Sequence, residues 1–383
     1  MRVAKRYDVA FYVPWVGPLL VPDAQTATGG AETQIFLLAR ALARRGMQVR
    51  LLVFDVPGAR MPDVVDGVAV AVRPPYRAWQ RLGKLREVEC LRRAVLDADA
   101  DVVVARAAGP DVGFTAAFAR WSRARFVYSS ASVSDFDYRR LSPKLRDRVL
   151  FRLGIALADR IVVQTDEQVA LCQARFRRPA ALIRSIAEPE PRREREPEAF
   201  LWVGRLHWNK RPLDYIELAR ALPEAAFWMV VVPVEHAGRS EMVAAVTREA
   251  ATVPNLHLLP ECSRPDLLEL VKRAVAVVNT SGFEGMPNVF LEGWARGVPS
   301  LASSYDPDGV IARHDLGGFA AGSPDRLVEL ATELWEQRLD QVPLSERCLR
   351  YVREFHAPDV VAREWEDVLR AVAGTGAGAG GGS

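Results

Sequence analysis

The stretch at residues 279–299, NTSGFEGMPNVFLEGWARGVP, decides the fold of this chain. It begins where an apolar run that predicts a buried strand ends, passes through a glycine-containing turn, and opens a helical pattern at Pro287 and Asn288. Gly297 and Pro299 predict the end of that helix. A strand, a glycine turn and a helix N-terminus together predict an anion site, because the first amides of a helix have no helical acceptor.

The expected ligands of the anion are the backbone amides around this turn. We expect the N–H groups near Gly285, Met286 and Asn288 to point outward with the positive end of the helix dipole. Glu284 lies on the turn, and Glu292 lies about one turn into the helix. Because carboxylates repel a phosphate, we expect them to accept hydrogen bonds from hydroxyl groups beside it. Sites for phosphate and for hydroxyl groups side by side predict a nucleotide sugar as the ligand.

Taken as a block, residues 281–292 read S-x-x-E-G-x-P-N-x-x-x-E, and this pattern resembles the signature of the family-4 retaining glycosyltransferases (glycosyltransferase group 1). The resemblance implies an α/β protein with the GT-B fold, in which two facing Rossmann-like doubly wound domains form an interdomain cleft. It implies that Glu284 holds hydroxyls of the transferred sugar and that Glu292 holds the ribose diol. The other donor-binding positions that it implies are Gly285, Met286, Pro287, Asn288 and Val289. The alternative is a Rossmann-like turn whose two glutamates only cap the helix and face solvent.

Length and composition limit the remaining possibilities. At 383 residues the chain is too long for one ordinary core and predicts two domains. No apolar run approaches the ~18–20 residues of a membrane span. Asp8 and Pro14 interrupt the opening residues, which therefore predict a strand and not a signal peptide. The cysteines are scattered without metal-ligand spacing, which favours reduced thiols and a cytoplasmic location: Cys90, Cys172, Cys262 and Cys348.

The net charge of +3 is unevenly distributed. Residues 1–190 contain 30 Lys and Arg against 20 Asp and Glu, so they carry +10, whereas residues 191–383 contain 21 against 28 and carry −7. A basic half suits an acidic partner such as a phosphorylated acceptor or the anionic inner surface of a membrane, with residues 139–152 as the contact. Nucleic acid is not expected because no binding motif accompanies the charge. Simple solvation of the arginines is the alternative.

The N-terminal half alternates strands with helices. A strand at residues 8–13 leads through a long loop to the sequence TGGAET and a helix at residues 31–45. Strand, glycine pair and helix again predict a phosphate cradle, because glycine lets backbone amides approach an anion closely. The family resemblance places this turn, with Gly29 and Gly30, at the donor phosphates. Further strands are predicted at residues 47–55, 68–72, 101–106, 125–130 and 160–165, which favours a parallel, doubly wound sheet.

Two strand ends depart from the family pattern. Related enzymes often carry a histidine at the end of one or both of the strands at 101–106 and 125–130, near the transferred sugar. This chain has Arg106 at the first position and Ser129 and Ser130 at the second. The departure leaves open how the N-terminal half contacts the sugar and the acceptor.

The charged, proline-interrupted stretch PEPRREREP at residues 189–197 predicts a linker. After it, FLWVGRLHWNKRP predicts a strand that ends at Gly204, with Arg205 and Lys210 on the connection to the next helix. Two cations at the carboxyl end of a strand can neutralise a diphosphate leaving group, and their spacing matches the family's G-R-…-K element.

The predicted organisation is an N-terminal acceptor domain (1–188), a linker (189–198), a C-terminal donor domain (199–355), a C-terminal helix that could pack back on the first domain (356–373), and a flexible tail (374–383).

A metal ion is the competing way to neutralise the phosphates. Of the D-x-D pairs in the chain, Asp306 and Asp308 follow a predicted strand and form the plausible rival site for Mg²⁺. Because Arg205 and Lys210 already supply positive charge, we expect neither a metal nor a cofactor. The expected catalytic residues are Glu284, Arg205 and Lys210.

These features predict a retaining glycosyltransferase that moves a sugar from a nucleoside-diphosphate sugar to a glycan, a lipid-linked or a small-molecule acceptor, in the cytoplasm or at the inner membrane surface. A nucleotide-sugar epimerase or hydrolase on the same fold should need acid and base groups at the sugar, and the absent strand-end histidines disfavour it. A non-catalytic nucleotide-sugar-binding protein is disfavoured by the intact charged residues Arg205, Lys210, Glu284 and Glu292. The sequence determines neither the base, the sugar, the acceptor nor the linkage.

Overall fold

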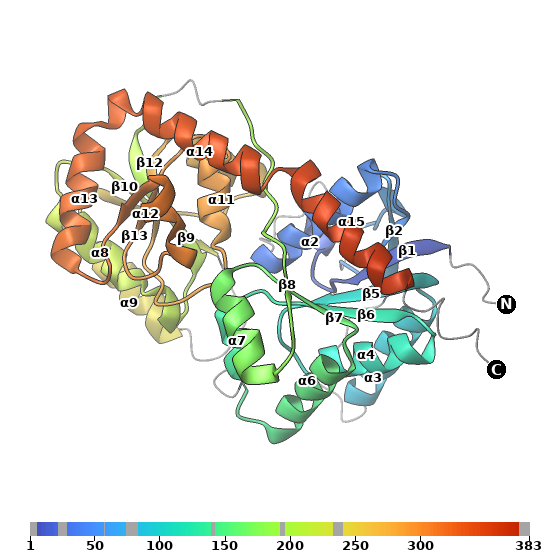
Figure 1. The fold of residues 1–383 in the computed structure, drawn as a ribbon. Coiled ribbons are helices and arrows are strands. Elements are labelled where there is room, and N and C mark those ends of the chain that lie inside the picture. The colour runs from blue at the N-terminus through green and yellow to red at the C-terminus, as the bar shows by residue number, and fades with distance from the viewer. Residues whose placement is uncertain are drawn as a thin grey trace, which may run out of the picture. The chain divides into compact units, whose positions relative to one another are not determined.

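The computed structural model describes residues 6–21, 29–56, 58–73, 83–138, 142–191, 196–232 and 240–374 (Figure 1). The chain folds as two compact units. Unit 1 comprises Met1–Ile186 and Pro358–Ser383, and unit 2 comprises Ala187–Ala357. Within the described ranges, no helix combines the length and the apolar character that a membrane span requires.

Unit 1 is built on an eight-stranded sheet in the order β3-β4-β2-β1-β5-β6-β7-β8. Neighbouring strands are parallel, except that β3 and β4 are antiparallel. The central strands are almost entirely apolar and buried, as expected where helices cover both faces of a parallel sheet. The strands are β1 (Tyr7–Tyr12), β2 (Val49–Phe54), β3 (Val64–Val65), β4 (Val68–Arg73), β5 (Ala100–Arg106), β6 (Arg125–Ser129), β7 (Arg160–Val163) and β8 (Ala181–Leu182).

Alternate residues of the unit 1 strands feed two hydrophobic cores, one on each face of the sheet. On one face, Trp365 of α15 meets Phe11 of β1 edge to face, with ring centroids 6.4 Å apart. Figure 1 shows α15, from the C-terminal end of the chain, lying along α2. The opposite core is formed with α3, α4, α6 and α7. The helical segments of this unit are α1 (Gly17–Leu20), α2 (Gly30–Arg44), α3 (Gly83–Leu96), α4 (Asp111–Trp121), η1 (Val133–Asp137), α6 (Leu145–Leu157), α7 (Asp166–Phe176) and α15 (Pro358–Gly374).

Helices α4 and α6 pack closely because each presents a glycine to the backbone of the other. A Cβ atom at Gly113 would lie 2.2 Å from the Leu150 carbonyl oxygen, and one at Gly154 would lie 2.7 Å from the Val112 carbonyl carbon. Neither position can therefore hold a larger residue without a shift of backbone. This contact fixes which side of α6 is buried and which side faces outward.

Unit 2 is built on a six-stranded, wholly parallel sheet in the order β11-β10-β9-β12-β13-β14. Two hydrophobic cores again cover its faces, one centred on Phe200 and Trp202 and the other on Phe290 and Trp294. The strands are β9 (Ala199–Arg205), β10 (Phe227–Val232), β11 (Leu256–Leu259), β12 (Ala274–Asn279), β13 (Ser300–Ala302) and β14 (Gly317–Phe319). The helical segments are η2 (Trp208–Lys210), α8 (Pro212–Ala221), α9 (Ser240–Ala250), α10 (Arg264–Lys272), α11 (Asn288–Trp294), η3 (Pro307–Gly309), α12 (Val310–His314), α13 (Pro324–Glu336), η4 (Arg338–Asp340) and α14 (Val342–Phe355).

The unit boundaries fall close to, but not within, the predicted linker at 189–198. The chain passes from unit 1 to unit 2 between residues 186 and 187, and it returns between residues 357 and 358. The start of the predicted linker belongs to unit 2, because Glu190 forms an ion pair with Arg296 and its amide donates to the Ala295 carbonyl at 2.8 Å. Residues 192–195 of the predicted linker and residues 375–383 of the predicted tail lie outside the described ranges.

Candidate functional site

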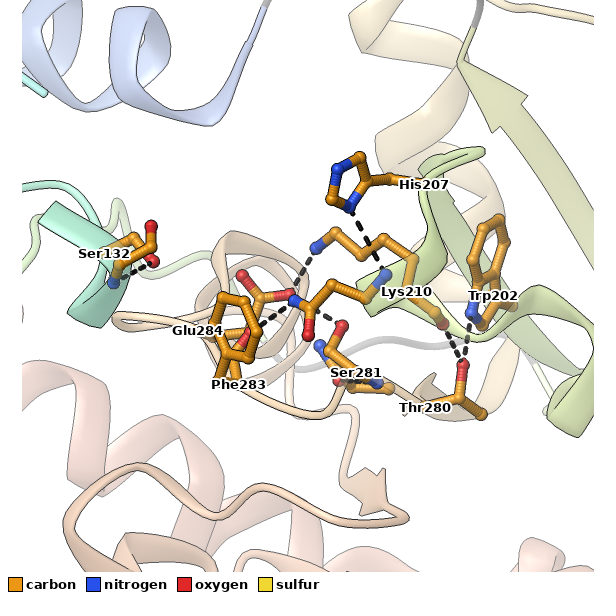
Figure 2. A network of polar contacts seen from close by, with 11 residues as sticks. Ser132, Trp202, His207, Lys210, Thr280, Ser281, Phe283 and Glu284 are labelled. Carbon is orange, nitrogen blue, oxygen red and sulfur yellow. Dashed lines mark hydrogen bonds and ion pairs between the residues drawn. The ribbon is translucent and has the colours of Figure 1, made fainter. Parts of the chain in front are cut away.

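The candidate site lies where two neighbouring strands of unit 2 end. β9 and β12 are parallel and adjacent, with Trp202 opposite Val278 in the register, so their carboxyl ends meet at one edge of the sheet. The short helix η2 follows β9, and the glycine-containing turn at residues 280–287 follows β12. Ligands bind at this edge in open parallel sheets. Figure 2 shows the polar contacts that join the two connections.

Buried and partly buried hydrogen bonds tie the two connections together. The indole of Trp202 donates to the hydroxyl of Thr280 at 3.0 Å, and that hydroxyl donates to the carbonyl oxygen of Lys210 at 2.6 Å. The side-chain amide of Asn209 donates to the carbonyl oxygen of Phe283 at 2.7 Å. The two loops are therefore held as one piece, and the side chains of Lys210 and of the turn keep a fixed relation.

The central contact of the site is the ion pair between Lys210 and Glu284. The same carboxylate oxygen of Glu284 accepts a hydrogen bond from the Ser281 hydroxyl at 2.7 Å. The two charged side chains are only partly buried, with 30% of Lys210 and 17% of Glu284 exposed, so both are accessible to a ligand. Arg205, at the end of β9, is exposed, and its side chain makes no ion pair or hydrogen bond with any other described residue. Lys210 is therefore a paired cation of the site, and Arg205 is an unpaired one among the described residues.

The second glutamate of the sequence block, Glu292, is held by a cation that the sequence analysis did not identify. Arg264, the first residue of α10, donates from Nη1 to a carboxylate oxygen of Glu292 on α11 at 2.8 Å. Only 14% of Glu292 is exposed, against 31% of Arg264. Arg264 and Glu292 lie 28 positions apart in the chain, so local sequence gave no signal of their pairing.

The residues between the two glutamates form the start of α11. Gly285, Met286 and Pro287 are buried, whereas Asn288 and Val289 are half-buried in the first helical turn. Pro287 is the N-cap residue, and its carbonyl oxygen accepts the first hydrogen bond of the helix, from the Phe290 amide, at 3.1 Å. The helix therefore begins where the proline predicted.

The glycine pair of the N-terminal half belongs to unit 1. Helix α2 begins at Gly30, and Gly29 is its N-cap. The carbonyl oxygen of Gly29 accepts hydrogen bonds from both the amide and the hydroxyl of Thr33, each at 3.1 Å. The helical end of this turn matches the prediction, because the glycine pair leads directly into a helix. Its assignment to the donor phosphates remains a prediction.

The departures from the family pattern, Arg106 and Ser129, contact one another. Arg106 donates from Nη1 to the Ser129 hydroxyl at 3.1 Å, and burial lowers the pKa of Arg106 to about 10. Asp135, which the sequence analysis did not identify, accepts hydrogen bonds from the Tyr128 hydroxyl at 2.9 Å and from the Ala131 amide at 2.8 Å. Burial raises the pKa of Asp135. Arg106 and Asp135 therefore both bond within unit 1, and Nε of Arg106 is a buried atom without a hydrogen-bond partner among the described residues.

The rival metal site is engaged in capping. Both carboxylate oxygens of Asp306 accept backbone hydrogen bonds, from the Ile311 amide at 2.9 Å and from the Ala312 amide at 3.2 Å. Among the described residues, no group of three or more His, Cys, Asp or Glu side chains is arranged to hold a metal ion. Arg205, Lys210 and Arg264 bring positive charge to the described site.

The sequence matches two family models that adjoin along the chain. The glycosyl transferase 4-like domain matches residues 29–187, and the glycosyl transferases group 1 family matches residues 184–355. Together these matches span most of the chain. The protein therefore belongs to the group 1 glycosyltransferases.

Individual relatives agree with this family. The UDP-Gal:alpha-D-GlcNAc-diphosphoundecaprenol alpha-1,3-galactosyltransferase of Escherichia coli is 28% identical over 134 residues, which is 33% of each protein. The glycosyltransferase 1 domain-containing protein 1 of Xenopus tropicalis is 28% identical over 112 residues, 29% of this chain and 32% of that protein. The chain thus matches about a third of the length of these curated relatives.

Solved structures establish the fold over nearly the whole chain. Sucrose-phosphate synthase from Thermosynechococcus elongatus superposes with a TM-score of 0.71 at 16% identity, covering 96% of this chain and 99% of that one. Anabaena Alr3699/HepE in complex with UDP and glucose superposes with a TM-score of 0.68 at 17% identity, covering 96% and 100%. The predicted GT-B fold, with two Rossmann-like units, is confirmed.

Proposed function

We propose that this protein is a retaining glycosyltransferase that transfers a sugar from a nucleoside-diphosphate sugar. The observation that carries the proposal is the meeting of Lys210 with Glu284 at the joined ends of β9 and β12, beside the unpaired Arg205. Two cations suit a diphosphate, and a partly exposed carboxylate suits the hydroxyl groups of a sugar. The family match supports the same reaction class.

In the proposed reaction, Arg205 and Lys210 stabilise the charge that develops on the diphosphate as it leaves. The bond between the anomeric carbon and the phosphate oxygen breaks, and a bond forms between that carbon and an acceptor hydroxyl oxygen on the same face of the sugar. The acceptor proton passes to the departing phosphate oxygen, so the configuration is retained without a protein nucleophile. Preorganised cations of this kind are among the largest contributors to catalysis, and no metal or cofactor is required.

The geometry of the Lys210–Glu284 pair gives each partner a second role. In the chain without ligand, the two charges neutralise one another, and Ser281 helps to hold the carboxylate in place. When a donor binds, Lys210 gains a phosphate as a second anionic partner, and Glu284 can accept from sugar hydroxyls with its remaining lone pairs. Glu284 therefore lies beside the anomeric centre, where positive charge develops in the transition state.

Glu292 is proposed to bind the ribose diol of the donor, with Arg264 as its positioning residue. The hydrogen bond from Arg264 fixes one carboxylate oxygen of Glu292, and the other oxygen is left to accept from the two ribose hydroxyls. Because these contacts are the same in the ground state and the transition state, they contribute to donor affinity more than to turnover.

The relatives indicate which substrates to try first. Anabaena Alr3699/HepE was solved with UDP and glucose, and the Escherichia coli relative is named for a UDP-galactose donor and a diphosphoundecaprenol-linked acceptor. We therefore propose a UDP-sugar donor and a lipid-linked acceptor for this chain, with glycan and small-molecule acceptors as alternatives. A lipid-linked acceptor would place the enzyme at the inner surface of a membrane.

The test begins with the thermal stability of the protein in the presence of UDP-, GDP-, ADP- and dTDP-sugars. A ligand that binds only the native state raises the melting temperature, and we expect one class of donor to do so. The shift should be reduced in Lys210→Ala and retained in Lys272→Ala, a control whose lysine lies on α10 and pairs with Glu190. If no donor raises the melting temperature, the proposed site is wrong.

Turnover then separates the alternatives. Donor consumption that requires an acceptor identifies a transferase. Consumption or isomerisation of the donor without any acceptor identifies a hydrolase or an epimerase, and binding without turnover under all conditions identifies a nucleotide-sugar-binding protein. Proton NMR of the product determines whether the anomeric configuration is retained or inverted.

A further inference from the structure

Helix α6 of unit 1 exposes large apolar side chains along one face. Leu145 is 71% exposed, Val149 is 58% exposed and Leu153 is 43% exposed. Residues four positions apart are neighbours on a helix, so these three side chains form a continuous stripe of about two turns. The opposite face of α6 is buried, with Phe151 in the core and Gly154 against α4. Isolated exposed leucines are ordinary, but a continuous apolar stripe on one helix indicates a contact surface.

Cations without acidic partners surround this stripe. Arg152 lies on the outward face of α6, and Lys144 immediately precedes the helix. Arg175 and Arg177 lie at the adjoining end of α7. All four are exposed, and none forms an ion pair with another described residue. Their charge is therefore available to an anionic partner.

A pocket opens beside the same helix. It has a volume of about 440 Å³ and lies among η1, α6 and the end of α7. Its apolar wall includes Tyr138 and Phe151, whose ring centroids are 4.7 Å apart, and Phe176, which lies 6.0 Å from Phe151. The cations that line it are Arg148, Arg152, Arg175 and Arg177, against one acidic residue, Asp137. An apolar wall with an arginine rim suits a phosphate that is attached to an apolar chain.

We propose that the outward face of α6 docks on a membrane that contains anionic lipids. The stripe of Leu145, Val149 and Leu153 enters the boundary between headgroups and acyl chains, as in helices that lie in the plane of a bilayer. Arg152 and its neighbours contact lipid phosphates, and the pocket accepts one headgroup. Residues 139–141, which the sequence analysis included in the basic contact, lie outside the described residues, and the proposed surface does not depend on them.

Charge favours a membrane over a second copy of the chain as the partner. Two copies that met through this face would bring the unpaired arginines of both together, and like charges brought together are unfavourable. An anionic bilayer instead offers apolar depth to the stripe and negative charge to the arginines. The proposal goes beyond the glycosyltransferase activity and does not require it, because docking involves neither donor nor turnover.

The experiment is flotation of the full-length protein with vesicles of phosphatidylcholine alone and of phosphatidylcholine mixed with phosphatidylglycerol. We expect binding to the mixed vesicles only, and we expect it to weaken as salt is raised, because the Debye length falls from ~30 Å at 0.01 M to ~8 Å at 0.15 M. Replacing Leu145, Val149 and Leu153 together by serine should lower the partition coefficient about tenfold or more, since binding scales with buried apolar area.

The matched control replaces Leu213, Val243 and Leu258 of unit 2 by serine, because these residues are also exposed, at 41%, 45% and 41%. This variant should bind vesicles like the wild type. A second pair of variants separates charge from packing: Arg152→Gln with Arg177→Gln should reduce the salt dependence, whereas Arg248→Gln with Arg326→Gln should not. Circular dichroism confirms that each variant is folded.

The proposal is overturned if neutral and anionic vesicles bind equally, or if the α6 variant binds like its control. Concentration-dependent dimerisation that the α6 variant abolishes would assign the surface to a second copy and would also overturn it. The thermal shift with the donor should be unchanged in the α6 variant. A failure of vesicle binding is therefore distinct from a failure of the proposed glycosyltransferase site.

Discussion

The carboxyl edges of the two parallel sheets use their polar side chains differently. In unit 1, Arg106 donates to Ser129, and Asp135 accepts from Tyr128 and Ala131 within the protein. In unit 2, Lys210 and Glu284 also bond to one another, but both remain partly exposed.

Similar strand topology is therefore used for stability in unit 1 and for ligand binding in unit 2. A parallel sheet with helices on both faces brings polar strand ends together at one edge in either unit. Burial then decides what those groups can do: the buried Asp135 bonds within unit 1 and stabilises it, whereas partly exposed groups can exchange a partner for a ligand. The comparison predicts that mutations at the unit 2 edge impair substrate binding and turnover, and that mutations at the unit 1 edge impair stability.

The largest effect is expected at Glu284. Glu284→Ala should lower kcat by roughly 10²–10³, because a contact made to charge in the transition state is worth ~2–4 kcal/mol. Donor affinity, measured by calorimetry, should change little, since interactions made only in the transition state appear in kcat. Glu336→Ala, an exposed change on α13, is the control. A folded Glu284→Ala protein with near-normal turnover would show that the active centre is misassigned.

Glu292 and Arg264 should affect donor binding instead. Glu292→Ala should raise the donor dissociation constant about 10–100-fold, in keeping with the ~1.5–3 kcal/mol of hydrogen bonds to a charged group. Arg264→Ala should have a smaller effect of the same kind, because it leaves Glu292 in place but no longer held. Kinetics should show the change in KM with kcat largely preserved. A fall in kcat alone for either variant would contradict the assignment to the ribose.

Asp135 should affect the stability of unit 1 and not the donor site. Asp135→Ala leaves the Tyr128 hydroxyl and the Ala131 amide without their acceptor, so we expect a loss of ~1–3 kcal/mol in the free energy of unfolding. Urea denaturation measures the loss, and the thermal shift with donor should persist. A stable Asp135→Ala protein that no longer binds the donor would contradict the prediction that mutations at the unit 1 edge impair stability and not donor binding.

The same residue gives a pH dependence of defined sign. Because burial raises the pKa of Asp135, the folded protein holds the proton more tightly than the unfolded chain does. The contribution of this group to stability is therefore fully present below its unfolded pKa of ~3.9 and is lost as pH rises through the folded pKa. Asp135→Asn should remove this component from the stability profile. An unchanged profile would show that Asp135 does not titrate in this way.

The smallest effect is expected from removal of divalent metal ions. Transfer should continue in EDTA, because Arg205 and Lys210 supply the positive charge and Asp306 is occupied in capping. Initial rates before and after chelation provide the measurement. Loss of activity that Mg²⁺ or Mn²⁺ restores would instead assign a role to a metal, with Asp306 and Asp308 as the first residues to replace.

The sequence by itself determined the elements that depend on local pattern. Apolar runs predicted β1, β2, β4, β5, β6 and β7 of the first sheet and β9 and β12 of the second, and Pro287 predicted the start of α11. The block around Glu284 predicted the family and the GT-B fold, both of which the comparisons confirm. These features are visible in sequence because strand and helix periodicity and turn chemistry involve residues that are close together in the chain.

Only the tertiary structure decided which side chains meet. Lys210 rather than Arg205 is the partner of Glu284, and Arg264 reaches Glu292 from another helix. The sequence analysis predicted neither α4 nor α7. The close packing of α4 on α6 depends on Gly113 and Gly154, which lie 41 positions apart in the chain. This packing turns the apolar stripe of α6 outward. Such pairings depend on which surfaces the chain buries against each other, and local sequence carries no direct record of contacts between distant segments.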